Sequence, residues 1–140
     1  MEYLSNINSI TSYLPELMIV ITILAVFIME SISTYRPLTY ITTIIGLIFA
    51  GLLLMISSSS TNLLFEGMII NDSLAIFFKW LILLSTLSIV LISRDDGSVL
   101  DEVKGEYYAM LLIITLGMFA MVSAKNLLMI YLAIEMVSIP

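Results

Sequence analysis

A glutamate lies inside an apolar stretch in which an ionised carboxylate is costly. Glu135 comes nine residues after Asn126, so a helix that starts at Asn126 carries it about 13–14 Å along its axis. That depth is near the middle of a hydrocarbon layer of about 30 Å, where a charge costs at least about 2.5–3.5 kcal/mol. The carboxylate must face protein or water, and must pair with a cation or hold its proton. We predict that Glu135 is a proton-coupling carboxylate, because its charge depends on these surroundings.

Polar groups next to Glu135 favour water near it. Tyr131 and Ser138 lie four residues before and three residues after it, so the three side chains share one helix face. Pro140 has no N–H to donate to the carbonyl of Met136, which leaves an acceptor close to the carboxylate. The alternative is a buried carboxylate that only locks the packing of helices.

The other charges near apolar runs are predicted to reach the membrane surface. If its helix starts at Ser73, Lys79 lies about 9 Å along the axis, and its stem can carry the ammonium back to the interface. Trp80 fits an aromatic belt at the same depth, and a functional charge at Lys79 is the alternative. Five side chains at run ends are expected to extend to headgroups or water, namely Glu16, Glu30, Arg36, Arg94 and Lys125.

The elements that carry these residues are predicted to be membrane helices. Of 140 residues, 61% are hydrophobic and 11% are charged, and the mean hydropathy is +1.14. Soluble domains are about 45–50% apolar and about 25% charged. Five apolar runs are separated by short polar breaks, at 14–32, 38–56, 74–92, 107–124 and 126–140. The predicted fold class is all-α, a polytopic transmembrane bundle of about five helices.

The breaks between the runs indicate how the helices connect. Residues 57–71 are predicted to form a polar loop, and the residues available to cap the next helix are Asn71, Asp72 and Ser73. The charged stretch at 94–106 must be solvated, and its aspartates are predicted to form a turn rather than a cation site. Only Lys125 separates the last two runs, which predicts a tight helical hairpin. Small residues four apart allow close helix approach at two pairs, Gly46 with Ala50 and Ala120 with Ala124.

The last run is too short to cross a membrane. From Asn126 to Pro140 there are too few residues for a layer of about 30 Å at 1.5 Å per residue, so the chain is expected to stop inside a helix, as a fragment or split subunit would. Basic residues in the breaks favour an N-terminus on the outside. No positive segment precedes the first run, so it is expected to remain as a span rather than a cleaved signal.

Composition excludes several kinds of site. The chain has no cysteine and no histidine, so it cannot build a Cys/His zinc site or ligate an iron–sulfur cluster or haem through these residues. We therefore expect no metal and no redox centre in this chain. The net charge of −6 argues against nucleic acid as a partner. No nucleophile–base pair or glycine-rich phosphate loop is found in the polar segments, and we expect no soluble substrate to bind directly.

Several stretches of the chain resemble a known family. The specific part is residues 105–140, above all 105–112, 115–118, 123–128 and 132–140, and residues 71–79 also match. These stretches resemble subunit N of the proton-translocating NADH:quinone oxidoreductase, respiratory complex I, an antiporter-like subunit family. The match implies the N-terminal third of that subunit. Residues 1–104 would form three N-terminal helices, and residues 105–140 would begin the first antiporter-like repeat.

The resemblance implies a fold and a function. The whole subunit would be a bundle of about fourteen helices with two inverted repeats, and Glu135 would face a lysine on the seventh helix, which this chain lacks. The complex would couple electron transfer from NADH to quinone to proton translocation. NADH, FMN, iron–sulfur clusters and quinone would be bound by other subunits. The chain would contact other membrane subunits and the lipid bilayer, in a bacterial inner membrane or, alternatively, a mitochondrial inner or thylakoid membrane.

Three departures from the family's pattern matter, and two other functions remain open. Lys125, Asn126 and Ala133 differ mildly from the family's usual residues, and the missing seventh helix leaves the proton route incomplete. One alternative is a subunit of a multisubunit sodium/proton antiporter or membrane-bound hydrogenase, which are similar proteins with the same glutamate. The other is a structural membrane protein in which Glu135 only packs helices.

Overall fold

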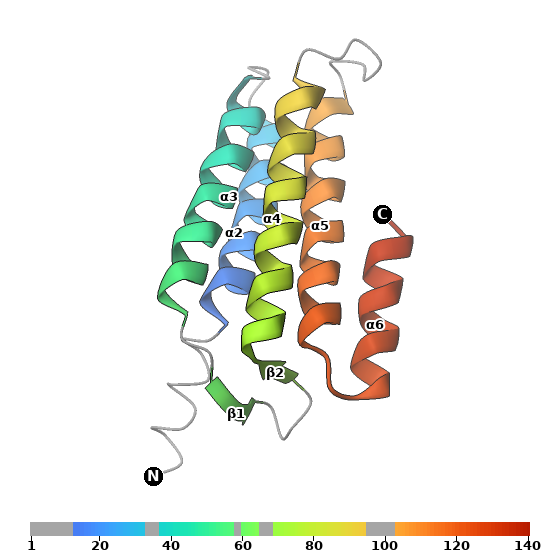
Figure 1. Cartoon of the computed structure of the whole chain (residues 1–140). Helices are drawn as coiled ribbons and strands as arrows, with labels where there is room; N and C mark the ends of the chain where they lie inside the picture. Colours follow the sequence, from blue (N-terminus) through green and yellow to red (C-terminus); the bar gives the residue numbers. More distant parts are fainter. Residues whose placement is uncertain (1–12, 33–36, 58–59, 65–68, 95–102) are drawn as a thin grey trace.

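Long antiparallel helices form the body of the molecule (Figure 1). The structure is a computed structural model and describes residues 13–32, 37–57, 60–64, 69–94 and 103–140. Its helices are α2 (Leu14–Ile32), α3 (Pro37–Ile56), α4 (Ser73–Ser93), α5 (Lys104–Ser123) and α6 (Leu127–Ser138). A short antiparallel hairpin, β1 (Ser60–Leu64) with β2 (Ile69–Asn71), joins α3 to α4. The predicted all-α class and its five helices are confirmed.

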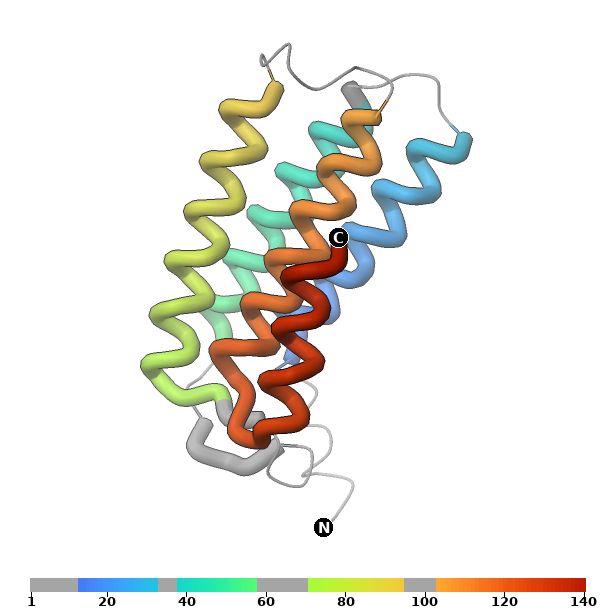
Figure 2. The backbone as a smooth tube through the Cα atoms, turned by 90° about the vertical axis from the view of Figure 1, so that its right-hand side faces the viewer, coloured from blue at the N-terminus to red at the C-terminus, as the bar shows by residue number. Residues whose placement is uncertain are grey.

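Of the five helices in the described residues, four are long and apolar enough to cross a membrane. They are 14–32, 38–56, 73–93 and 104–123, whereas α6 has only 12 residues. The predicted runs agree with these bounds, except that α5 begins at Lys104, three residues before the run predicted from 107. Figure 2 shows α6 lying beside α5 and ending partway along it.

Capping side chains begin two helices where the polar breaks predicted. Asp72 is the N-cap of α4, and its carboxylate accepts from the Ala75 N–H at 2.7 Å. Asn126 is the N-cap of α6 and accepts from the Leu128 N–H at 3.4 Å. The predicted tight hairpin between α5 and α6 is confirmed. The expected loop at 57–71 contains β1 and β2, which are too short to show a strand-like alternation of apolar residues.

The core lies between α2, α3, α4 and α5. It consists of the buried apolar side chains Ile19, Ile23, Val26, Leu47, Ala50, Leu54, Leu83, Val90, Tyr108, Ala109, Leu112 and Phe119. Gly46 of α3 lies directly against Thr22 of α2, so the predicted role of small residues at Gly46 and Ala50 is confirmed. Apolar side chains on the outer faces, such as Leu24 and Leu84, stay about half exposed, as expected of helices that face lipid.

Threonine hydroxyls in the bundle are satisfied without water. Thr43, Thr86 and Thr115 each lie 2.7–3.0 Å from the carbonyl oxygen four residues earlier. The hydroxyls of Thr86 and Thr115 also lie 2.9 Å apart, which joins α4 to α5. An internal partner is needed because lipid offers none.

Glu30, near the end of α2, packs against the start of α5. Its side chain is half-buried and its carboxylate lies against Gly105 in the first turn of α5, where a Cβ would overlap it. The Glu30 carboxylate lies against α5 because the end of α2 meets the start of α5, and the expectation that Glu30 reaches the membrane surface stays a prediction. A carboxylate is favourable at this end of a helix, where backbone N–H groups are exposed.

The Gly46→Ala substitution is expected to lower the free energy of unfolding by about 1–3 kcal/mol, because the new methyl group would overlap the short Thr22 side chain, whose β-carbon is attached to the backbone of α2. The matched control is Gly51→Ala in α3, where a Cβ meets Trp80 and Leu83 at 3.7–3.8 Å, an ordinary contact. Helix propensity alone should make that control neutral or more stable by about 0.5–1 kcal/mol. Equal effects of the two substitutions in a denaturation experiment would contradict this packing.

Candidate functional site

Glu135 lies nine residues beyond the N-cap of α6, as the sequence predicted. Its side chain is half-buried, and only Ala133 of α6 is fully buried. Within the part of the chain that the structure describes, the one ion pair is that of Lys79 with Glu16, so no cation there pairs with Glu135. Glu135 is thus held on an apolar helix without a cationic partner from the described residues.

The polar stripe of α6 is present only in part. Tyr131 lies one turn before Glu135 and is 61% exposed, and its phenol is near enough to the carboxylate for the two groups to interact. The hydroxyl of Ser138 instead donates to the Ile134 carbonyl at 2.8 Å. The local hydrogen bond of Ser138 therefore competes with the hydration that we expected it to favour.

Close packing against α5 fixes the position of α6. A Cβ on Gly117 would lie 2.8 Å from a methyl carbon of Val137, 3.0 Å from Cβ of Met136 and 3.3 Å from the carbonyl oxygen of Ala133. Ala133 itself is 1% exposed. Gly117 therefore lets the two backbones approach next to Glu135, and α6 cannot come as close to a larger residue.

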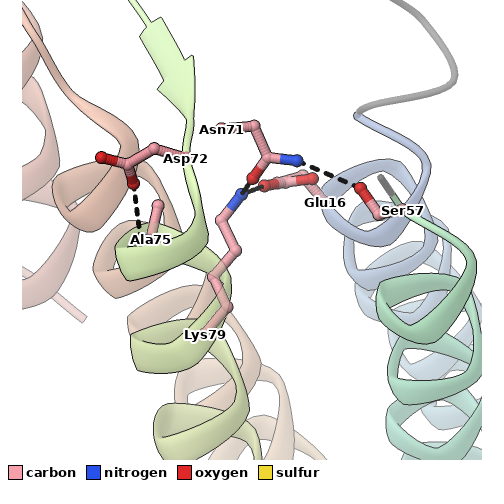
Figure 3. Close-up of polar contacts among 6 residues, drawn as sticks. All are labelled: Glu16, Ser57, Asn71, Asp72, Ala75 and Lys79. Carbon is pink, nitrogen blue, oxygen red and sulfur yellow. Dashed lines mark hydrogen bonds and ion pairs between the residues drawn. The ribbon is translucent and has the colours of Figure 1, made fainter. Parts of the chain in front are cut away.

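A second charged site lies at the end of the bundle where α2 and α4 begin (Figure 3). Lys79 Nζ is 2.5 Å from Glu16 Oε1 and donates to Asn71 Oδ1 at 3.1 Å. The Asn71 amide donates to the Ser57 hydroxyl at 3.1 Å. Lys79 Nζ also lies 5.9 Å from the centre of the Phe119 ring. This cluster, Glu16–Lys79–Asn71–Ser57, joins α2, α4, β2 and the residue after α3.

Two predictions about surface charges are wrong at this cluster. Lys79 is 1% exposed and Glu16 is 8% exposed, so neither extends to headgroups or water. Trp80 is half-buried and packs near Gly51 of α3, and its place in an aromatic belt stays a prediction. The buried position of Lys79 is compatible with the alternative, a functional charge, which stays a prediction.

The ion pair could have been found in the sequence. Antiparallel helices place the starts of the first and third runs at the same end of the bundle, and Glu16 and Lys79 lie within two turns of those starts. Side chains of a helix point toward its N-terminus, which directs the lysine toward the glutamate. The prediction that each charged side chain returns to the interface considers each charge alone. It overlooks that Glu16 and Lys79 have opposite charges and lie at the same level of the bundle.

Glu16 also acts on a neighbouring phenol. Burial raises the pKa of Tyr13, just before α2, above its ordinary value of 10.0, and the Glu16 carboxylate raises it further. The unfolded phenol loses its proton near pH 10.0, whereas the folded one keeps it at higher pH. The contribution of Tyr13 to stability is therefore fully present below that pH and is lost as the pH rises above it.

The Tyr13→Phe variant is accordingly expected to lose less stability than the wild type when the pH rises above 10.0. Denaturant midpoints on either side of that pH measure the difference. Equal alkaline losses in the two proteins would show that this phenol does not contribute.

No protein-family model matches this chain, but several curated proteins similar to it are named as subunit N of NADH-quinone oxidoreductase. The NADH-quinone oxidoreductase subunit N of Anaeromyxobacter sp. (strain Fw109-5) is 35% identical over 137 residues, 95% of this chain and 26% of that protein. Subunit N 2 of Chloroherpeton thalassium is 37% identical over 131 residues, 91% of this chain and 25% of that protein. Subunit N of Methylovorus glucosotrophus is 32% identical over 130 residues, 90% of this chain and 27% of that protein.

The similarity extends over most of this chain but over a small part of its relatives. The chain spans about a quarter of the length of the curated relatives that it matches, less than the expected third. Its long apolar helices agree with an integral membrane protein. The chain is thus homologous to the NADH-quinone oxidoreductase subunit N family, to which it is similar over about nine-tenths of its own length.

Proposed function

We propose that this chain is part of a membrane-arm subunit of an NADH:quinone oxidoreductase, in which Glu135 is a proton-coupling carboxylate. The complex would couple electron transfer from NADH to quinone to proton translocation. The similarity to curated subunit N proteins supports membership of such a complex. The observation that supports the role of Glu135 is its position nine residues into an apolar helix without a cation among the described residues.

The residue types of this chain bear on which subunits of the complex bind the cofactors. With neither cysteine nor histidine, it lacks the usual protein ligands of haem and iron–sulfur clusters. We propose that NADH, FMN, iron–sulfur clusters and quinone are bound by other subunits of the complex. The partners of this chain would be other membrane subunits and lipid, in a bacterial inner membrane with the N-terminus outside.

The physical basis is the cost of an unpaired charge in lipid. An isolated carboxylate at the depth of Glu135 favours its protonated form, and an approaching cation favours the ionised form. A lysine elsewhere in the complete subunit would therefore control whether Glu135 holds its proton. Tyr131 can donate to the ionised carboxylate and would lower the cost of the charged state.

The names of the relatives favour this proposal over a sodium/proton antiporter or hydrogenase subunit. A purely structural role for Glu135 makes a different prediction. It requires that a neutral side chain at this position lower the stability of the complex and leave transport per assembled complex unchanged.

The test is the Glu135→Gln substitution in the complete subunit, with the complex assembled in vesicles. We expect NADH oxidation with a lowered number of protons moved per electron, because glutamine cannot take up a proton. The matched control is Glu106→Gln, a change of an exposed glutamate in the first turn of α5.

A Glu135→Gln complex that assembles and pumps at the control's ratio would refute the proposal. Reduced assembly with an unchanged ratio would support the structural role instead.

A further inference from the structure

A pair of threonine hydroxyls joins α4 to α5 inside the bundle. Thr86 and Thr115 are both buried, and their hydroxyl oxygens lie 2.9 Å apart. Each hydroxyl is also near the carbonyl oxygen four residues earlier in its own helix, at 3.0 Å for Thr86 and at 2.7 Å for Thr115. A hydroxyl has a single proton to donate, so the two hydroxyls cannot donate in all three contacts at once.

The distances indicate which hydroxyl donates across the interface. The contact of Thr115 with its own carbonyl has the length usual for an O–H···O bond, about 2.7–2.8 Å, and that of Thr86 is longer. Thr115 therefore donates within α5, and Thr86 donates to the oxygen of Thr115. Apolar contacts are non-directional and let two helices turn and slide by small amounts, whereas this hydrogen bond fixes one atom of each helix.

The helix α5 passes this constraint to the helix that carries Glu135. It lies between α4 and α6, and α6 packs chiefly on it (Figure 1). Thr115 and Gly117 are about 3 Å apart along the axis and about 200° apart around it, so they face different neighbours. At Gly117 an added Cβ would lie 3.3 Å from the carbonyl oxygen of Ala133. Because Glu135 follows Ala133 by two residues, the position of α5 determines where Glu135 lies.

We propose that Thr115, held by the hydroxyl of Thr86, is a positioning residue for Glu135. The inference rests on the proposed role of Glu135 in proton coupling. Thr115 acts through its helix and not on the proton: its bond to α4 fixes α5, and α5 fixes α6. A displacement of about 1 Å can slow a reaction about 100-fold, so the exact position of α5 matters for a carboxylate on the next helix.

The same contacts predict that loss of this bond costs little stability. In Thr115→Val the side chain keeps its branched shape, and the Thr86 hydroxyl can donate to the carbonyl of its own helix at 3.0 Å. No buried polar group is then left without a partner, so the unfolding midpoint should stay near that of the wild type. A residue that only stabilised the bundle would lower the midpoint when replaced.

The first experiment measures the distance from α4 to α6 in the full chain in liposomes. Spin labels at Leu84→Cys and Leu132→Cys, both exposed positions, give a distribution of distances by double electron–electron resonance. We expect a narrow distribution in the chain with both threonines, a broadened or shifted one in Thr115→Val, and a narrow one in Thr115→Ser, which keeps a hydroxyl. The matched control is Thr43→Val, because Thr43 is buried and donates to a carbonyl of its own helix.

The second experiment measures the protons moved per electron by the complete complex in vesicles. Thr115→Val should lower this ratio, whereas Thr115→Ser and Thr43→Val should keep it. If circular dichroism shows that Thr115→Val loses its helices, Thr86→Val takes its place, because it removes the other hydroxyl of the pair.

An unchanged distance distribution in Thr115→Val would overturn the proposal. A broadened distribution with an unchanged ratio would also overturn it, and so would a ratio that falls only together with the unfolding midpoint. The distances are measured without proton pumping, and Glu135→Gln tests the role of Glu135 separately. Failure of the threonine contact is therefore distinguishable from failure of the proposed function.

Discussion

The Lys79→Met variant is expected to unfold with a free energy about 3–5 kcal/mol lower than that of the wild type at neutral pH. The substitution keeps most of the side-chain volume but leaves the buried Glu16 carboxylate without its cation. Asn71 also loses the donor to its oxygen. The loss should shrink as the pH is lowered, because the orphaned carboxylate can then take up a proton.

A double-mutant cycle separates the ion pair from the surrounding packing. In the Glu16→Gln/Lys79→Met protein both charges are gone, so its stability should lie closer to the wild type than that of Lys79→Met. The free energy of unfolding is measured in mild detergent for the wild type, the two single variants and the double variant. Additive losses, with no coupling between the two positions, would contradict the buried pair.

The Gly117→Leu substitution is expected to detach α6 from α5. Even a Cβ at Gly117 would lie 2.8–3.3 Å from Val137, Met136 and Ala133, and one of these contacts is to backbone that cannot rotate away. Overpacking of this kind costs about 1–3 kcal/mol. Because α6 packs chiefly on α5, the cost should appear as local opening, with its amides exchanging about tenfold faster or more.

Hydrogen exchange resolved by peptide checks this expectation. The control is Met118→Leu, a substitution of nearly equal volume at the next residue, which should cost less than about 1.5 kcal/mol. Unchanged exchange in α6 of Gly117→Leu, with a change confined to α4, would show that the helices pack in another way.

Length and hydropathy were sufficient to predict the helices but not their mutual contacts. An apolar run bounded by polar residues is a local feature, and the runs at 14–32 and 38–56 match α2 and α3 almost residue for residue. Helix caps are equally local, which is why Asp72 and Asn126 could be anticipated. The β hairpin was missed because strand pairing in so short a segment depends on the ends of the helices it joins.

The position of Glu135, nine residues beyond the N-cap of α6, followed from counting residues, but the contacts of the other charges did not. A charged side chain near the end of an apolar run can extend to water or pair with an oppositely charged side chain. Which of these occurs depends on which helices are adjacent. Glu16 and Lys79 form an ion pair because α2 and α4 start at the same end of the bundle (Figure 1). The Glu30 carboxylate lies against Gly105 for a similar reason, because the end of α2 is next to the start of α5. Gly105 has no side chain and so leaves room for the carboxylate.

The central claim is that position 135 lies too deep for an unaided charge, and a spin label measures that depth directly. These 140 residues contain no cysteine, so Glu135→Cys gives a single labelling site. Leu24→Cys, on an apolar outer face, and Glu106→Cys, exposed at the start of α5, provide the references for lipid and water. In liposomes, collision with a water-soluble nickel quencher should be as rare at 135 as at 24, with oxygen more effective. Quenching by nickel at 135 as strong as at 106 would place the residue at the headgroup level and contradict the account.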